Sequence, residues 1–148
     1  MSVNVTGSIS EGTCDLSAGD VNRSVKLSSI FKGDLPPSGA AGAVNFNLTV
    51  GNCAAGLSNA TFTFSGTPDP NDGLRYMNTG NATGVAIELA SSSDGQTIGA
   101  NGTNNSRTVA ISGGQAVLGL TASYWRIGTV PIKAGSVSAV ATVNTSYN

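Results

Sequence analysis

The stretch that decides the fold lies near the end of the sequence and reads GSVSAVATVNTSY, residues 135–147. Its even positions are mostly Ser, Thr and Asn. Alternation of this kind, with a period of two, is typical of a β-strand that has one buried face. The stretch therefore predicts a long final strand, whose inward positions would be Val137, Ala139, Ala141, Val143, Thr145 and Tyr147.

The same alternation recurs along the chain, and helical periodicity is scarce. Further alternating runs cover residues 3–9, 44–50, 61–65, 85–89 and 118–124. Clusters of Gly, Pro, Asn and Ser separate them, as expected of turns, and residues 36–42 predict a loop. A helical turn is expected only at residues 19–23 or 28–32. Six to eight short strands in 148 residues predict a single all-β domain, a sandwich of immunoglobulin type.

Composition excludes several classes of function. Charged residues make up 10% of the chain, and 7 basic residues against 8 acidic ones leave a net charge of −1. Without a basic face, nucleic acid and anionic lipid are poor partners. The chain has no His, which removes the commonest general base and metal ligand. We therefore expect no enzyme, no cofactor and no metal.

No apolar run approaches the roughly 18 residues of a membrane helix, and no signal-peptide core is present. If the protein is secreted, the sequence is expected to be the mature form, with Met1 an unusual or added first residue.

The only two cysteines are Cys14 and Cys53. Their spacing matches no redox or zinc motif, and both lie at the ends of strand-like runs. A pair of unrelated buried thiols is the alternative, but the composition favours one disulfide and therefore an oxidising compartment.

Three other features have ordinary explanations that we favour. Asp69 and Asp72 could bind calcium, but they fit a turn much better. Asn-X-Ser/Thr triplets could accept glycans, yet a chain this rich in Asn, Ser and Thr produces them by chance. Tyr124 and Trp125 are adjacent, so one faces the core; the other could stack on a sugar or sit at an edge or interface.

Taken together, the runs resemble the subunits of classical chaperone–usher pili, the type 1 and P pilus families, over the whole chain. The resemblance rests on the order and spacing of these features: the 3–9 run before Cys14, the 44–50 run before Cys53, the 61–65 and 84–89 runs, Ala122 and Tyr124, and the final 135–143 run with Tyr147 next to last.

The resemblance implies an incomplete immunoglobulin-like β-sandwich that is completed by a donor strand from another chain. Residues 1–10 would be the N-terminal donor-strand extension and residues 11–148 the pilin domain. The donor strand would present Val3, Val5, Gly7 and Ile9. The acceptor groove, which also binds the chaperone, would be flanked by the C-terminal strand, with Val137, Ala139, Ala141, Val143, Tyr147 and Asn148.

The function implied is a structural fimbrial subunit that polymerises head to tail by donor-strand exchange, building a surface fibre used in adhesion. Expected partners are neighbouring pilin subunits, a periplasmic pilus chaperone and an outer-membrane usher. The expected location is the periplasm during assembly and the extracellular fimbrium afterwards. The alternative is a tip or minor subunit that binds glycans directly, as an adhesin does.

Overall fold

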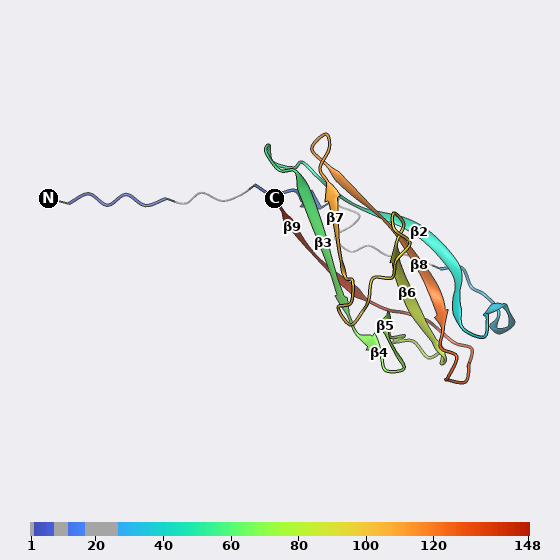
Figure 1. The fold of residues 1–148 in the computed structure, drawn as a ribbon. Helices are drawn as coiled ribbons and strands as arrows, with labels where there is room; N and C mark the ends of the chain where they lie inside the picture. Colours follow the sequence, from blue (N-terminus) through green and yellow to red (C-terminus); the bar gives the residue numbers. More distant parts are fainter. Residues whose placement is uncertain (1, 8–11, 17–26) are drawn as a thin grey trace.

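The structure is a computed structural model that describes residues 2–7, 12–16 and 27–148. The described domain is a sandwich of two β-sheets (Figure 1). The larger sheet has the strand order β1-β2-β8-β6-β5-β4, and the smaller one has the order β7-β3-β9. All named strand pairs are antiparallel. The predicted all-β sandwich is confirmed.

The strands are short except for two that run the length of the larger sheet. Their bounds are β1 Asp15–Leu16, β2 Gly39–Gly51, β3 Asn59–Gly66, β4 Pro68–Asp69, β5 Asp72–Tyr76, β6 Val85–Ser91, β7 Ser106–Ala110, β8 Ala116–Arg126 and β9 Ala141–Tyr147. Within the described residues the helical content is a single 3-10 turn, Lys32–Asp34, and nothing there is long or apolar enough to be a membrane-spanning helix.

The core lies between the sheets and is built from the inward positions of the alternating runs. Val50, Phe62, Phe64 and Leu120 are all at most 1% exposed. The disulfide between Cys14 and Cys53 joins the residue before β1 to the segment that follows β2, at one end of this core.

The outward positions of the sheets carry uncharged polar contacts between strands. The hydroxyl groups of Thr61 and Thr108 lie 2.9 Å apart across β3 and β7, and Thr63 and Ser106 repeat the arrangement at 2.9 Å. On the larger sheet, Thr121 donates to the Asn45 side chain at 2.7 Å. We call these contacts the hydroxyl ladder.

Two boundaries differ from the sequence-based expectation. Residues 39–42 belong to β2 instead of a loop, because residues 39–41 pair with the end of β8 and a bulge follows between Ala41 and Val44. Gly42, with φ +66°, permits that bulge. The final strand β9 begins at Ala141, later than the alternation predicted. The helical turn at Lys32–Asp34 overlaps one of its two predicted places, and the other, residues 19–23, lies outside the described residues.

Candidate functional site: an open groove between the sheets

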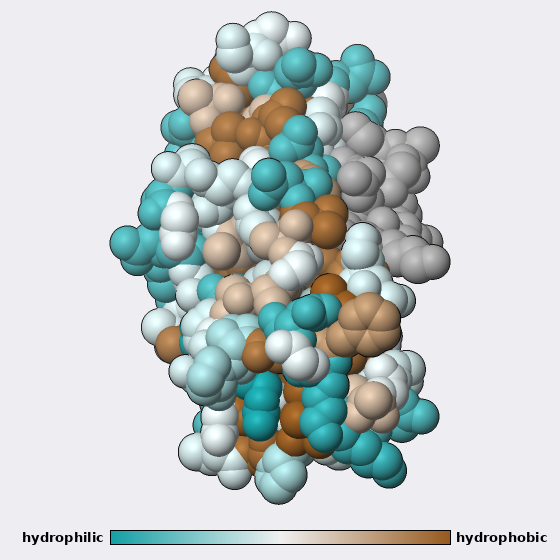
Figure 2. Space-filling model, turned by 90° about the vertical axis from the view of Figure 1, so that its right-hand side faces the viewer, coloured by the Kyte–Doolittle hydropathy of each residue, from teal (hydrophilic) through white to brown (hydrophobic). Residues whose placement is uncertain are grey.

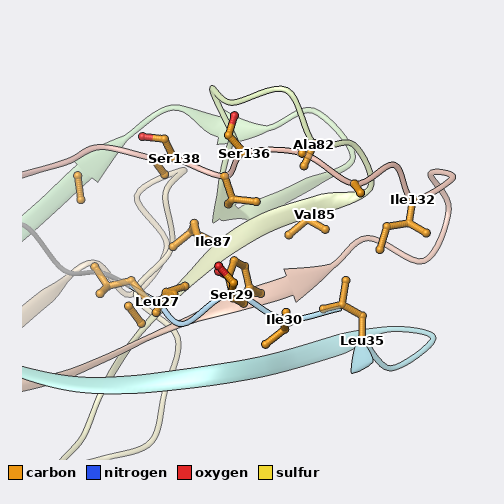
Figure 3. Close-up of a pocket in the computed structure, with 18 of the residues that line it drawn as sticks. Leu27, Ser29, Ile30, Leu35, Ala82, Val85, Ile87, Ile132, Ser136 and Ser138 are labelled. Carbon is orange, nitrogen blue, oxygen red and sulfur yellow. The ribbon is translucent and has the colours of Figure 1, made fainter. Parts of the chain in front are cut away.

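The domain contains an elongated groove of about 790 Å³ that opens between two walls. One wall is residues 27–35, and the other is residues 132–143. Figure 3 shows Val85 and Ile87 of β6 lying between the two walls. Apolar side chains from β2, β3, β6 and β8 complete the floor: Phe46, Leu48, Phe64, Leu89, Leu120 and Ala122.

The apolar lining is continuous with the core beneath it. Leu48, Phe64 and Leu120 line the groove and are also members of the buried core cluster. A sandwich normally covers such side chains with a strand, because exposed apolar surface costs free energy. Figure 2 shows that apolar surface on one face is spread in several patches along the molecule's long axis. As far as the described residues go, the groove therefore has the character of an uncovered strip of core.

The second wall presents a strand edge to the groove. Asn148 and Asn59 exchange both backbone hydrogen bonds, at 3.0 and 3.1 Å. In an antiparallel ladder, residue pairs that exchange both hydrogen bonds alternate with pairs that exchange none. Counting back from Asn148, the backbone groups of the even-numbered residues of β9 therefore bond to β3. The N–H and C=O groups of the odd-numbered residues of β9 then point to the opposite edge, where a further strand could join.

Four of the predicted groove residues line it, namely Val137, Ala139, Ala141 and Val143. The other two lie at the far end of β9. Tyr147 packs against the core, and its hydroxyl group lies 2.9 Å from that of Thr145. Asn148 continues the ladder, with its backbone oxygen accepting hydrogen bonds from the N–H groups of Ser58 and Asn59. The assignment of all six to strand and chaperone binding stays a prediction.

The described part of the predicted donor segment, residues 2–7, extends away from the domain (Figure 1). Val3 is 79% exposed and Val5 is 88% exposed, and Gly7 has no atom near the place of a Cβ. Ile9, like the predicted boundary between residues 10 and 11, lies outside the described residues. The described part of this segment is therefore not folded into the groove of its own chain.

Sequence reasoning missed the first wall. Ile30, Phe31 and Leu35 line the groove from a segment without regular alternation. Phe31 is 83% exposed, and its N–H donates to the Asp34 carboxylate at 3.0 Å, which orders the 3-10 turn. The Tyr124 hydroxyl donates to the Ser28 carbonyl at 3.0 Å and ties this wall to β8. The sequence signal from which this wall could have been predicted is a cluster of apolar residues in a segment that lacks the alternation of a strand.

A close approach supports the start of β9. Gly66 pairs with Ala141, and a Cβ on Gly66 would lie 2.5 Å from two ring carbons of Tyr76. The Tyr76 ring is 2% exposed, and its burial raises the pKa of Tyr76 to about 12. Glycine at this position lets the ring pack directly beneath the strand.

The other side chains that the sequence suggested as possible binding sites have structural roles. The Asp69 carboxylate accepts hydrogen bonds from the N–H groups of Asn71 and Asp72, which is the arrangement of an Asx turn. Among residues 2–7, 12–16 and 27–148, no three acidic or Cys side chains gather as a metal site. The Arg75 guanidinium lies 3.5 Å from the centre of the Trp125 ring and pairs with Glu88 at 2.6 Å. One face of the Trp125 ring is therefore already occupied.

The chain is similar to known proteins along nearly its whole length. Residues 3–148 match the family model described as "Fimbrial protein". The S-fimbrial adhesin protein SfaS of Escherichia coli O6:K15:H31 (strain 536 / UPEC) is 31% identical over 146 residues, which are 98% of this chain and 83% of the relative. The S-fimbrial protein subunit SfaG of the same strain is 30% identical over 145 residues, 93% of this chain and 78% of the relative.

The fold is that of a solved pilus protein. The crystal structure of the P pilus rod subunit PapA matches with a TM-score of 0.76 at 20% identity, covering 91% of this chain and 99% of that one. The sandwich is thus an immunoglobulin-like fold of the pilin type, as the sequence predicted.

Proposed function

Since this chain belongs to the fimbrial protein family and is a structural subunit of a surface fibre, we propose that its subunits join head to tail by donor-strand exchange. In this proposal residues 1–10 of one subunit enter the groove of the next. The resulting contact is heterologous and does not close, so it generates a filament. The observation that carries the proposal is the open apolar groove, together with an apolar N-terminal segment that extends from the same chain.

Chemical complementarity supports the pairing. Within the described residues, the groove offers an apolar floor and a strand edge with no strand paired to it, and residues 2–7 offer alternating apolar side chains on an extended backbone. Burying Val3, Val5 and Ile9 stabilises the contact by about 5–9 kcal/mol at about 1.5–3 kcal/mol per side chain. This is comparable with the net stability of a whole domain, about 5–15 kcal/mol. Strand addition of this kind obtains its affinity from the main chain and its specificity from the side chains.

The same groove gives the reason for further partners. An uncovered strip of core and a free strand edge promote aggregation. We propose that a periplasmic chaperone covers the groove through Val137, Ala139, Ala141, Val143, Tyr147 and Asn148 until an outer-membrane usher hands the subunit to the fibre. The chain would then pass through the periplasm before reaching the cell surface. Its contribution is structural, with no catalytic step.

Direct glycan binding is the second candidate, because one of the relatives is named an adhesin. Binding of the purified subunit to an array of glycans separates the two functions. Specific binding to one sugar class would support the adhesin, and a blank array together with fibre formation supports the structural role alone.

Two complementary variants test the exchange. A chain without residues 1–10 keeps the groove and loses the segment, so it should accept a strand and not donate one. Ala141→Phe places a ring at the groove edge, so this variant should donate a strand and not accept one. Each variant alone should stay monomeric by size-exclusion chromatography, and an equimolar mixture should form heterodimers.

The heterodimer itself controls for misfolding of the chain without residues 1–10, which needs a native groove to accept a strand, and native circular dichroism controls for misfolding of the Ala141→Phe variant. Long fibres from either variant alone would refute the proposal. A mixture that stays monomeric, with both variants showing native circular dichroism, would refute it as well.

A further inference from the structure

The second wall of the groove is extended before it becomes a strand. Residues 132–140 precede β9 and lie outside the named strands, yet they line the groove as far as Ala139. Their backbone is held by residues 78–83, the loop between β5 and β6. In Figure 3, Ala82 lies beside Ser136, above Val85.

Two asparagine side chains make this attachment. The Asn78 amide nitrogen donates to the carbonyls of Ala82 and Ser136, at 3.0 and 3.2 Å, and the Asn78 side-chain oxygen accepts the N–H groups of Gly80 and Ser138, both at 2.8 Å. The Asn81 side-chain oxygen accepts the Ser136 N–H at 2.5 Å and the Ser136 hydroxyl at 3.0 Å. We call Asn78 and Asn81 the asparagine clamp.

Backbone bonds from the loop complete the attachment at the same two residues. The Thr79 N–H donates to the Ser138 carbonyl at 2.8 Å, and the Ala82 N–H donates to the Ser136 carbonyl at 3.0 Å. Both backbone groups of Ser136 and of Ser138 are therefore directed to the loop.

Two glycines make the close approach possible. A Cβ on Gly80 would lie 2.3 Å from the Ser136 carbonyl oxygen, and a Cβ on Gly135 would lie 2.3 Å from the Asn81 side-chain oxygen. Real Cβ atoms do not approach other atoms so closely, so larger residues would separate the loop from the wall. The sequence thus supplies both the clamp and the space that the clamp needs.

The asparagine clamp determines the direction in which the backbone N–H and C=O groups of the second wall point. In an extended segment, the backbone groups of alternate residues point to opposite edges. Because Ser136 and Ser138 bond to the loop, the N–H and C=O groups of Val137 and Ala139 point toward the groove. The N–H and C=O groups of the odd-numbered residues of β9 point the same way, so the strand edge continues beyond the sheet as far as Val137.

We propose that Asn78 and Asn81 are positioning residues for donor-strand capture. They hold residues 135–139 extended and present the backbone of Val137 and Ala139 to the incoming strand before it arrives. This inference rests on the proposed function. Without the clamp, the incoming strand would have to order this wall while it binds, and capture would be slower.

Substitution by aspartate should have different effects at the two asparagines, which makes the test specific. Asn81 uses only its side-chain oxygen as an acceptor in these contacts, so Asn81→Asp keeps them. Asn78 also donates, so Asn78→Asp loses two donors and sets a carboxylate against the carbonyls of Ala82 and Ser136. Asn71→Ala is the matched control, because the Asn71 side chain is exposed in the β4–β5 turn.

The assay mixes the full-length chain with an excess of a fluorescent peptide of residues 2–12 and follows capture by anisotropy. Asn78→Ala, Asn78→Asp and Asn81→Ala should capture the peptide at least tenfold more slowly than the native chain. Asn81→Asp and Asn71→Ala should stay within threefold of it. Hydrogen exchange should accelerate at the amides of residues 136 and 138 in the slow variants and remain native in β3 and β8.

The outcomes separate the inference from the function on which it rests. Failure of the native chain to capture the peptide would overturn both. Native capture that is equally fast in Asn78→Asp would overturn the clamp alone, and so would an Asn81→Asp variant as slow as Asn81→Ala. Faster exchange throughout β3 and β8 would mean general unfolding and would also overturn a local positioning role.

Discussion

Val5→Thr tests the fibre contact at a single methyl group. Val and Thr have nearly the same shape, so the substitution exchanges one methyl group for a hydroxyl group. Val5 is 88% exposed in its own subunit, so the stability of that subunit should not change. The whole effect should therefore appear in the contact with the neighbouring subunit.

The expected loss of binding free energy follows from the exposure of the Val5 side chain. A side chain that is almost fully exposed before insertion gains nearly the full benefit of burial afterwards. Losing the methyl group costs about 0.8 kcal/mol, and burying the hydroxyl group without a partner costs about 1–3 kcal/mol. Together they weaken the contact by about 2–4 kcal/mol, a factor of roughly 30 to 700 in the dissociation constant.

The assay uses the heterodimer between the chain without residues 1–10 and the Ala141→Phe variant, in which only the latter donates its segment. Val5→Thr is introduced into the donor, and dissociation is followed by size-exclusion chromatography in increasing urea. Thr6→Val is the matched control, since neighbouring residues of a strand face opposite sides. The Thr6→Val variant should have a dissociation constant within about threefold of that of the native heterodimer.

Two results would refute the reasoning. Equal urea midpoints for the native and Val5→Thr heterodimers would mean that Val5 is not buried in the neighbour. A weak Thr6→Val heterodimer beside an unaffected Val5→Thr heterodimer would mean that the inserted strand has the opposite face inward.

Three further predictions concern the domain itself. Gly66→Ala should lower the free energy of unfolding by about 1–3 kcal/mol in a urea titration, because its Cβ would overlap the buried Tyr76 ring; an unchanged midpoint would contradict that packing. The folded state keeps the Tyr76 proton up to pH 12 while an unfolded tyrosine loses it near pH 10, so stability should fall between about pH 10 and 12. Tyr76→Phe should remove that part of the pH dependence, and an identical alkaline slope would argue against it. Replacing both Cys14 and Cys53 with Ser should cost about 4 kcal/mol by the chain-entropy model, measured by thermal unfolding, and equal melting temperatures would exclude a stabilising bridge.

The strands that could be predicted are those with one buried face. In residues 44–50 and 61–65, the apolar positions of the alternation include Leu48, Val50, Phe62 and Phe64, and all four are buried. Burial of one face imposes the period of two, so the sequence retains it. The composition could also be read correctly, since few charges and abundant Ser, Thr and Asn indicate a secreted β protein.

The strand β7 could not be predicted because Arg107, one of its two inward residues beside Val109, is charged. Arg107 is only 9% exposed and donates to the Asn104 carbonyl at 2.7 Å, so a charged side chain interrupts the apolar alternation of this strand. The extension of β2 to Gly39 arises from its pairing with β8, which is a long-range contact.

Of the two walls of the candidate groove, only the second was predicted from the sequence. The alternation of Val137, Ala139, Ala141 and Val143 marks the second wall, and the structure places these residues in the groove. The attachment of that wall by Asn78 and Asn81 depends on side chains more than 50 residues away. Such contacts leave no periodic pattern, since a lone Asn in a loop looks the same whether it bonds to water or to a distant backbone.

The hydroxyl ladder has a consequence for the environments in which the fibre stays intact. Contacts between neutral hydroxyl and amide groups are barely screened by dissolved ions, unlike those between opposite charges. The chain also has no imidazole that would change its charge between about pH 5 and 8. A fibre surface built in this way keeps its structure in dilute, saline or mildly acidic fluid alike.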